Sequence, residues 1–545
     1  LRTLEIQEME ARVEEEAKLE RFIQWSQLNG VQFRGCEVKR CDSIKGFGLF
    51  SSGNISDDTL LVVALDLAIT PMSVLQDPVL GPECKALFDG GEVDDRFLMI
   101  LFLTVERLRN SSSWKPYFDM LPTTFGSPLW FSDDELLELK GTTLYKATQM
   151  QKKTLHSLYN EKVKYLVKKI LTIHGDPGRE VCFEDFLWAN SVFWARAMNI
   201  PFPHSYVFPQ FEDGQHSCLS KFSESSGTDT NLGPSTVLID EKDKKWFDDF
   251  EHEKVAGTTS TSIHGKTVWV EGLVPVIDFC NHDLKATATW EVDETGSTTG
   301  IPCSMYLLIA ARSPCQIKKE ITISYGNKGN EELLFLYGFV MDNNPDDYIM
   351  KADMRCLLPR NLLARGFFLA SPAQELDDDN SIANQVCSYS WSGQRKMPSY
   401  SAKLIFPEGF LTALRTIAMQ ESEVFQVISM LNELVESDGD RQPSDAEVRA
   451  AVWEACGDSG ALQLLVDLLN MKSMDLEEGS GKEVCDTELL EQADNTRRES
   501  NEPQVMSRNK WCSIVYRRGQ KQLTTLFLKE AEHALQLSLT QLNEH

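Results

Sequence analysis

The chain has 545 residues, of which 42% are hydrophobic and 9% aromatic. This length is enough for two to four domains with apolar cores, so we expect a folded protein. Its 54 Lys and Arg residues are outnumbered by 82 Asp and Glu residues, which gives a formal net charge of −28. A surface of this charge repels phosphate backbones and argues against a general nucleic-acid partner.

The apolar runs at 60–69 and 97–105 are too short to cross a bilayer, so we expect a soluble protein with no membrane partner. The 13 cysteines are scattered and contain no Cys-x-x-Cys pair. An odd number of dispersed cysteines in a large chain favours a reducing, intracellular compartment.

Residues 1–28 place apolar side chains at helical intervals among many Glu residues and predict an amphipathic helix. Residues 31–70 consist of short β-type runs separated by Gly and Asp. Residues 212–262 are mostly polar and predict an inserted flexible loop. Between these two regions we expect helices at 96–109, 133–139, 144–171 and 183–199, the last closed by Pro201.

β-type runs return at 267–270, 288–292, 305–311 and 320–325. The rest of the chain is mainly helical in pattern, with amphipathic stretches at 411–435, 446–471 and 522–542. A polar, acidic stretch at 475–509 predicts disorder. This order requires two β segments far apart in sequence to pair around a helical insertion, so we expect an α+β fold.

The first candidate motif is Lys45-Gly46-Phe47-Gly48-Leu49-Phe50. Two glycines that flank one residue allow the backbone to approach a charged ligand closely. A plain β-turn explains the pattern at least as well. The motif lacks the third glycine and the downstream helix of a dinucleotide or phosphate loop.

The second motif is the apolar run 273–280, which ends in Asn281-His282-Asp283. It places an amide and a titratable ring at a strand end, although a capped strand end is an equally good interpretation. A zinc site through Cys280, His282 and Asp283 is disfavoured, because neighbouring residues cannot all point at one ion. We therefore expect no metal.

The third motif is Ile321-Thr322-Ile323-Ser324-Tyr325-Gly326, a strand that ends in an aromatic residue and a glycine. A short helical segment follows, and its end presents two further aromatic rings, Tyr337 and Phe339. Packing in the core explains each of these rings equally well.

Gly-Phe-Gly-Leu-Phe, Pro-x-x-Asp-x-x-Asn-His and Ile-x-x-Ser-Tyr-Gly leading into Leu-x-x-Tyr-Gly-Phe occur in this order. Together they resemble the signature of SET-domain protein methyltransferases of the rubisco large-subunit methyltransferase class, over about residues 31–347. The resemblance implies a SET-domain β-fold with an inserted helical subdomain and an all-α C-terminal domain. The implied parts are an N-terminal helix at 1–30, SET segments at 31–130 and 265–347, an insertion at 131–264, and a substrate-binding-like helical domain at 348–545.

By this resemblance the chain is expected to be an S-adenosylmethionine-dependent protein methyltransferase, most readily a protein-lysine N-methyltransferase acting on a non-histone protein. A histidine target stays open. The alternative is a SET-fold protein that has lost turnover and serves as a protein-interaction scaffold. The class implies a protein substrate docked on the C-terminal helical domain, and a chloroplast location, with cytoplasm or nucleus as alternatives.

The resemblance also implies the roles of single residues. Tyr325 would be the catalytic tyrosine, Phe339 would pack on the adenine of the donor, and Tyr337 would wall the target channel. Arg196 would pair with the carboxylate of the donor. The donor-binding set implied by the class is Gly46, Phe47, Gly48, Arg196, Asp278, Asn281, His282, Tyr337 and Phe339. Lys45 departs from the class, which often has an acidic residue there; a cation would repel the ammonium group of the donor unless it is directed outward.

Overall fold

The computed structural model describes residues 2–42, 45–52, 58–91, 93–173, 175–176, 179–207, 267–310, 318–350, 390–392, 408–437, 443–499 and 506–543. The predicted flexible loop at 212–262 lies outside these residues. The chain forms two compact units, one of Leu1–Thr124 with Leu155–Asn327 and one of Phe125–Thr154 with Lys328–His545. The domain boundaries predicted from the sequence differ from these units and stay predictions.

Two four-stranded sheets form the β part of the first unit. One sheet has the strand order β1-β4-β9-β8 and the other has the order β2-β3-β10-β7. The strands of the first sheet are β1 (Gln32–Phe33), β4 (Thr59–Ala64), β8 (Ala288–Asp293) and β9 (Ser304–Ile309). Those of the second are β2 (Cys36–Asp42), β3 (Gly46–Ser51), β7 (Asn281–His282) and β10 (Glu320–Ile323).

Strands from distant parts of the sequence pair in both sheets, as the order of elements predicts. In one sheet β4 pairs antiparallel with β9, so that Val62 lies opposite Tyr306. In the other, β3 pairs antiparallel with β10, so that Leu49 lies opposite Ile321. Leu49 and residues 60–63 of β4 are buried, because these strands face the core.

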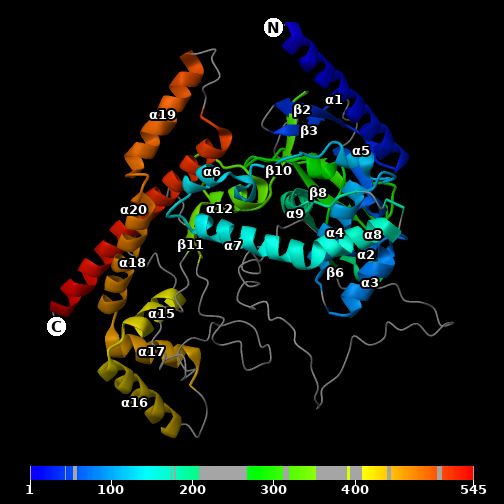
Figure 1. Cartoon of the computed structure of the whole chain (residues 1–545). Coiled ribbons are helices and arrows are strands. Elements are labelled where there is room, and N and C mark those ends of the chain that lie inside the picture. The colour runs from blue at the N-terminus through cyan, green and yellow to red at the C-terminus, as the bar shows by residue number, and fades with distance from the viewer. Residues whose placement is uncertain are drawn as a thin grey trace. The chain divides into compact units, whose positions relative to one another are not determined.

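Helices cover the sheets of the first unit. The helix α1 (Arg2–Leu28) runs beside β2 and β3 (Figure 1), where Glu15 of α1 forms an ion pair with Arg40 of β2. The helices α4 (Asp95–Leu108) and α9 (Phe183–Arg196) pack on each other, and most of their buried residues are apolar. The remaining elements of this unit are η1 (Leu65–Leu67), α2 (Pro71–Gln76), α3 (Gly81–Asp89), α5 (Lys115–Phe118), η3 (Tyr159–Val163), α8 (Lys164–Ile173), β5 (Met198–Pro203), α10 (His204–Val207), β6 (Thr267–Gly272) and η4 (Ile277–Phe279).

Helices dominate the second unit. Its helices are η2 (Pro128–Trp130), α6 (Asp133–Leu137), α12 (Asn330–Glu332), η5 (Leu333–Tyr337), α15 (Glu408–Ala418), α16 (Glu421–Ser437), α17 (Asp445–Cys456), α18 (Ser459–Glu477), α19 (Glu483–Glu499) and α20 (Arg508–Asn543). The strands β11 (Tyr348–Met350) and β12 (Ser390–Ser392) form a two-stranded antiparallel sheet. The helix α7 (Thr143–Leu158) begins in this unit and ends in the other. Leu465 of α18 and Phe527 of α20 belong to one apolar cluster, so these two helices share a core.

This architecture confirms the α+β class, with helices making up most of the C-terminal region. Some predicted helices end early or are interrupted. The helix expected at 183–199 ends at Arg196, because the next residues form β5 and pair with β6. The helix expected at 411–435 is interrupted at 419–420, and the one expected at 446–471 is interrupted at Gly457, whose φ of 59° is not helical.

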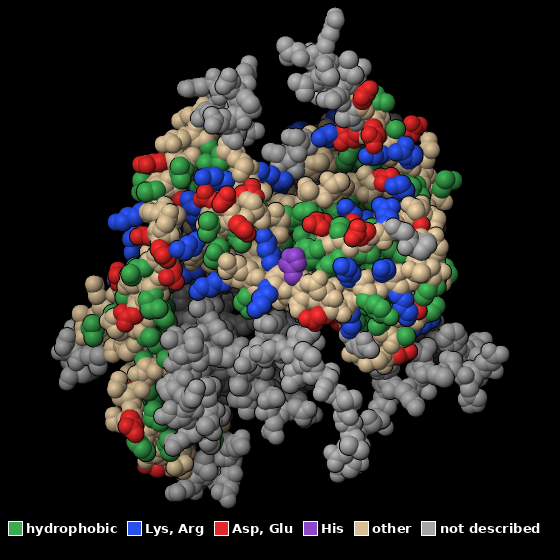
Figure 2. Space-filling model, viewed as in Figure 1, with side chains coloured by type: hydrophobic (Ala, Val, Ile, Leu, Met, Phe, Trp, Pro, Cys, Tyr) green, Lys and Arg blue, Asp and Glu red, His purple; other side chains and the backbone are tan. Residues whose placement is uncertain are grey.

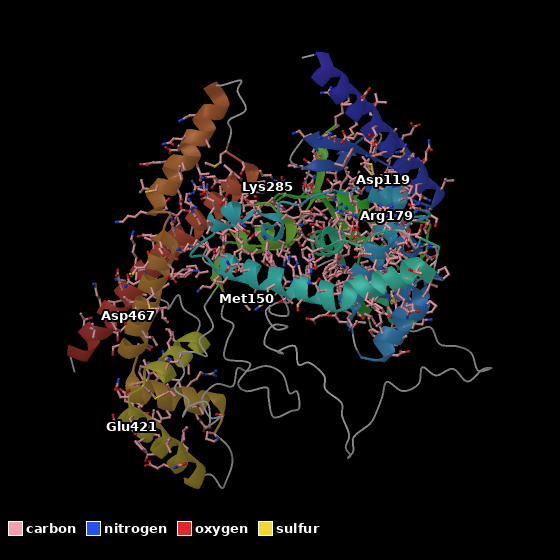
Figure 3. All side chains as sticks on the ribbon, in the orientation of Figure 1. Asp119, Met150, Arg179, Lys285, Glu421 and Asp467 are labelled. Carbon is pink, nitrogen blue, oxygen red and sulfur yellow. The ribbon has the colours of Figure 1, made fainter. Side chains whose placement is uncertain are left out.

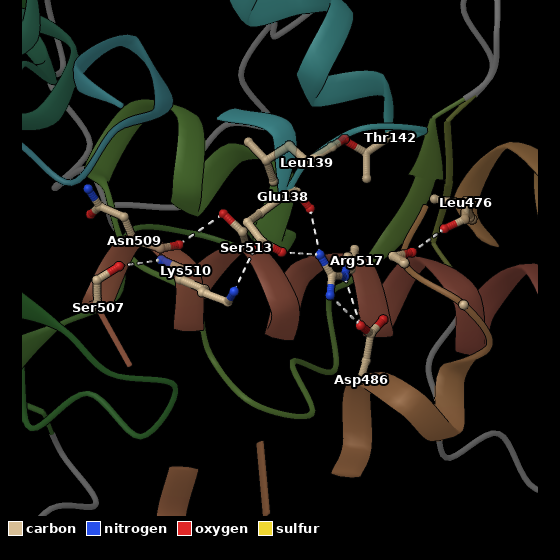
Figure 4. A network of polar contacts seen from close by, with 12 residues as sticks. Glu138, Leu139, Thr142, Leu476, Asp486, Ser507, Asn509, Lys510, Ser513 and Arg517 are labelled. Carbon is tan, nitrogen blue, oxygen red and sulfur yellow. Dashed lines mark hydrogen bonds and ion pairs between the residues drawn. The ribbon is translucent and has the colours of Figure 1, made fainter. Parts of the chain in front are cut away.

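The prediction of disorder at 475–509 was wrong for most of that stretch, since residues 483–499 form α19. The polar composition of this stretch gave no sign of a tertiary contact that it makes within the second unit. The carboxylate of Asp486 is fully buried and binds Arg517 of α20 at 2.6 Å (Figure 4). It also binds Lys521 of α20 at 2.7 Å. This contact stabilises the ordered helix, because a buried charge is tolerated when it is paired.

Candidate active site

A parallel strand pair brings the Asn-His motif beside the tyrosine motif. In β7 and β10, Asn281 lies opposite Thr322 and His282 lies opposite Ile323. Two residues beyond this pair, the N–H of Tyr325 donates a hydrogen bond to Nδ1 of His282 at 3.1 Å. Because Nδ1 accepts this bond, a neutral His282 ring carries its proton on Nε2.

The Tyr325 ring is fixed at its other end as well. Its hydroxyl donates a hydrogen bond to the main-chain oxygen of Cys280 at 2.7 Å, and its ring centroid lies 5.1 Å from that of His282. Cys280 directly precedes the Asn-His pair. The tyrosine is therefore oriented by the same segment that carries the predicted donor-binding residues.

The Gly-Phe-Gly motif opens β3, the strand next to β10. Gly46 has a φ of +74°, which favours glycine, and a Cβ built there meets no atom within 4 Å. A Cβ at Gly48 would lie 2.6 Å from Sγ of Cys41 and 3.0 Å from Nδ2 of Asn281. A larger residue at position 48 would therefore clash with side chains of the protein itself. Glycine leaves room for the Asn281 amide to lie beside the glycine motif.

Lys45 lies in a chain of polar contacts that ends at Asn281. Its Nζ binds Oε2 of Glu320 at 3.0 Å, and the other carboxylate oxygen of Glu320 accepts a hydrogen bond from Nδ2 of Asn281 at 2.7 Å. The Lys45 side chain is 47% exposed and that of Glu320 is 19% exposed. The charge that departs from the class pattern is therefore matched by an adjacent carboxylate.

Asp278 and Arg196 form a buried ion pair. Nη1 of Arg196 donates to Oδ2 of Asp278 at 3.1 Å and to its main-chain oxygen at 2.9 Å. The Tyr117 hydroxyl donates to the same carboxylate oxygen at 2.7 Å, and the guanidinium of Arg196 lies over the ring of Phe279, 4.8 Å from its centroid. Arg196 is the residue that the resemblance implies for the donor carboxylate. Its Nη1 is already hydrogen-bonded to Asp278.

Burial dominates the protonation of this cluster. The Asp278 side chain is fully buried, which raises the pKa of its carboxyl above the ordinary range, and the hydrogen bonds and charge supplied by Arg196 and Tyr117 offset this only in part. Burial and the neighbouring Asp278 also raise the pKa of the Tyr117 hydroxyl. Tyr117 is a site residue that the sequence patterns did not reveal.

Tyr337 and Phe339 belong to the second compact unit, where their ring centroids lie 6.3 Å apart. Gly338 between them has a φ of +74°, and it ends η5 in a left-handed turn that allows the chain to reverse. Burial raises the pKa of the Tyr337 hydroxyl, and Glu332 adds to this effect. The predicted place of both rings beside the donor stays a prediction.

The zinc interpretation gains no support among the described residues, where no group of three His, Cys, Asp or Glu side chains could hold a metal ion. Asp283 instead accepts a hydrogen bond at 2.8 Å from the N–H of Lys285, a residue that Figure 3 labels.

In the part of the chain that the structure describes, no helix is both long and apolar enough to span a membrane. On the face drawn in Figure 2, Lys and Arg side chains lie among Asp and Glu side chains.

Comparisons with known proteins place this geometry in context. No family model matches the chain. The chain is 26% identical over 329 residues to the chloroplastic ribulose-1,5 bisphosphate carboxylase/oxygenase large subunit N-methyltransferase of Pisum sativum, which covers 59% of this chain and 51% of that protein. It is 31% identical over 180 residues to the chloroplastic fructose-bisphosphate aldolase-lysine N-methyltransferase of Arabidopsis thaliana, covering 33% and 35%. It is 23% identical over 364 residues to the actin-histidine N-methyltransferase of Homo sapiens, covering 63% and 47%.

A solved structure extends the likeness to nearly the whole chain. The crystal structure of the SET domain of LSMT bound to lysine and AdoHcy superposes with a TM-score of 0.61 at 19% identity, covering 95% of this chain and 91% of that one. The chain has the SET-domain fold. The chain spans about half the length of the Pisum sativum relative. The similarity therefore shows the fold, and the activity of this chain is argued below.

Proposed function

We propose that this chain is an S-adenosylmethionine-dependent protein-lysine N-methyltransferase whose substrate is a non-histone protein. The observation that carries the proposal is the convergence of three sequence motifs on one sheet, where Tyr325 is hydrogen-bonded to both His282 and Cys280. The names of relatives from Pisum sativum and Arabidopsis thaliana, both lysine or rubisco N-methyltransferases, support it.

The residues at this sheet suit the proposed donor. The open space at Gly46 and its positive φ allow main-chain groups to approach a ligand, and the half-buried Asn281 amide lies beside Gly48. We assign donor binding to Gly46, Phe47, Gly48, Arg196, Asp278, Asn281, His282, Tyr337 and Phe339. In this assignment Arg196 serves the donor through its remaining N–H groups and by holding Asp278 and Phe279 in place.

The donor, when bound, supplies a methyl group on a positively charged sulfur that leaves as a neutral thioether. The target amine first loses a proton to solvent, and its nitrogen then forms the new N–C bond as the S–C bond breaks. Tyr325 orients the amine through its hydroxyl, and the oxygen of Cys280 fixes that hydroxyl. Alignment of nucleophile, methyl and sulfur accounts for most of the expected rate gain, because no covalent enzyme intermediate is needed.

A histidine target is the second candidate. The resemblance to an actin-histidine N-methyltransferase extends over 63% of this chain, which supports it. The relative from Arabidopsis thaliana that is named a lysine N-methyltransferase has higher identity, at 31% over 180 residues, so we favour lysine.

We propose that the protein substrate docks on the C-terminal helical domain at 348–545. Phe425 of α16 and Trp453 of α17 support this, because their side chains are 62% and 56% exposed, and exposed aromatic rings are enriched where proteins meet. We further propose a chloroplast location, which the names of the Pisum sativum and Arabidopsis thaliana relatives support. Exclusion of nucleic acid rests on the net charge of −28 and stays a prediction.

Two measurements test the proposal. Titration calorimetry with S-adenosylmethionine is expected to show saturable binding, and the absence of binding would favour the scaffold alternative. Incubation with isotope-labelled donor and a chloroplast or whole-cell extract is expected to label a protein on lysine, identified by mass spectrometry. Label on histidine would replace lysine as the target, and binding without any label in the extracts would contradict the activity.

A further inference from the structure

The orientation of the Asn281 amide is dictated by Glu320. Nδ2 of Asn281 donates to Oε1 of Glu320 at 2.7 Å and also lies 3.5 Å from Sγ of Cys41. A carboxylate only accepts hydrogen bonds, so the opposite amide orientation would place two acceptor oxygens against each other. The half-buried Glu320 therefore selects one of the two possible amide orientations.

This selection leaves the amide oxygen facing away from the carboxylate. Among the described residues, Oδ1 of Asn281 accepts no hydrogen bond, although the side chain is half-buried. A half-buried amide oxygen without a partner is an acceptor available to a ligand. It lies on the residue that follows Cys280, whose main-chain oxygen holds the hydroxyl of Tyr325.

We propose that Glu320 is a positioning residue, which holds the Asn281 amide so that its oxygen accepts a hydrogen bond from the ammonium group of the donor's amino-acid moiety. This inference rests on the proposed function, because it assumes a donor with such a moiety. Glu320 touches Asn281 and not the reacting atoms. Its contribution therefore concerns recognition of the amino-acid part and not of the adenosine part.

The same carboxylate also forms an ion pair with Lys45. The Lys45 ammonium binds Oε2 of Glu320 at 3.0 Å, so the Glu320 carboxylate is shared between a cation and an amide. If Glu320 loses its charge, this ion pair with Lys45 is lost as well.

Two ligands separate positioning from a merely structural role. S-adenosylhomocysteine and 5′-methylthioadenosine share the adenosine and a neutral sulfur, but only the first carries the amino-acid moiety. Calorimetry on the full chain is expected to show that Glu320→Gln weakens S-adenosylhomocysteine about tenfold and leaves 5′-methylthioadenosine unchanged, because one charge-linked hydrogen bond is worth about that factor. Equal weakening of both ligands, or of neither, overturns the inference.

Glu37→Gln is the matched control, because Glu37 lies on the same sheet and binds Lys39 at 2.5 Å. It is expected to leave both affinities unchanged. In an Asn281→Ala background, Glu320→Gln is expected to change the affinity ratio no further, and a further tenfold change contradicts action through the amide. If Glu320→Gln does not fold, Asn281→Ala alone has to remove the preference for S-adenosylhomocysteine, and an unchanged ratio refutes the inference. Failure of the wild-type chain to bind either ligand overturns the proposed function itself.

Discussion

The Tyr325 hydroxyl and the main-chain oxygen of Cys280 are joined by a hydrogen bond of 2.7 Å. This bond fixes the phenol beside the residues assigned to the donor, so Tyr325→Phe removes a group from the reacting centre without removing a donor contact. We expect calorimetry to show donor affinity close to that of the wild type. Single-turnover methyl transfer is expected to slow about 10²-fold, because the hydroxyl no longer orients the nucleophile. Unchanged turnover would remove Tyr325 from its catalytic role.

The close packing around Gly48 makes a second prediction. In Gly48→Ala the new methyl group would lie 2.6 Å from Sγ of Cys41 and 3.0 Å from Nδ2 of Asn281, so the Asn281 amide has to shift. Donor affinity measured by calorimetry is expected to fall about tenfold. Adding Cys41→Ala removes the nearer contact and is expected to restore part of the loss. If the double variant binds as weakly as Gly48→Ala, crowding by Cys41 is not the cause.

Sequence reasoning found the three motifs because each has a local pattern of residues. It could not identify their partners, since Asn281 meets Glu320 only through the register of the parallel pair β7 and β10. The contact of Tyr117 with Asp278 likewise joins residues 161 positions apart. Nothing in the spacing of either residue points to the other.

The misjudged stretch at 475–509 shows the same limit in the second unit. Its composition is polar and acidic, which predicts disorder when each residue is weighed alone. One signal was present in the sequence, because Arg517 and Lys521 stand four residues apart on one face of a long helix. Arg517 and Lys521 are buried cations of this helix and need counter-ions; Asp486 binds both, and Glu138 also binds Arg517.

This network makes a prediction for stability. Asp486→Ala removes the counter-ion shared by the Arg517 and Lys521 side chains, each 4% exposed. Arg517 then keeps only its ion pair with Glu138 (Figure 4). Loss of one partner from a buried ion pair costs about 3–5 kcal/mol, so the free energy of unfolding in urea should fall by about that amount. Asp467→Ala on α18 is the control (Figure 3), because Asp467 is exposed, and it should change stability by less than about 0.5 kcal/mol. If Asp486→Ala lowers the free energy of unfolding no more than Asp467→Ala does, the network contributes little to stability.

A buried carboxyl in the second unit makes stability depend on pH. Glu331 is 1% exposed; its Oε2 accepts hydrogen bonds from Thr143 at 2.7 Å and Tyr516 at 2.5 Å, while Oε1 accepts none among the described residues. Burial raises the pKa of Glu331 above its ordinary value of 4.5, and the charges facing it are those of Lys472, which lowers the pKa, and Glu332, which raises it.

Because the folded chain holds this proton more tightly than the unfolded chain, the stabilising effect is present below about pH 4.5 and is lost as the pH rises through the raised pKa of the folded state. Glu331→Gln keeps an acceptor for Tyr516 but does not titrate. We therefore expect the stability of this variant relative to the wild type to increase from pH 4 to pH 8, by about 1.4 kcal/mol for each unit of pKa shift. Urea unfolding at several pH values measures the difference. Glu478→Gln is the control, because Glu478 is 65% exposed, and a difference that is constant with pH for both variants would contradict a raised pKa for Glu331.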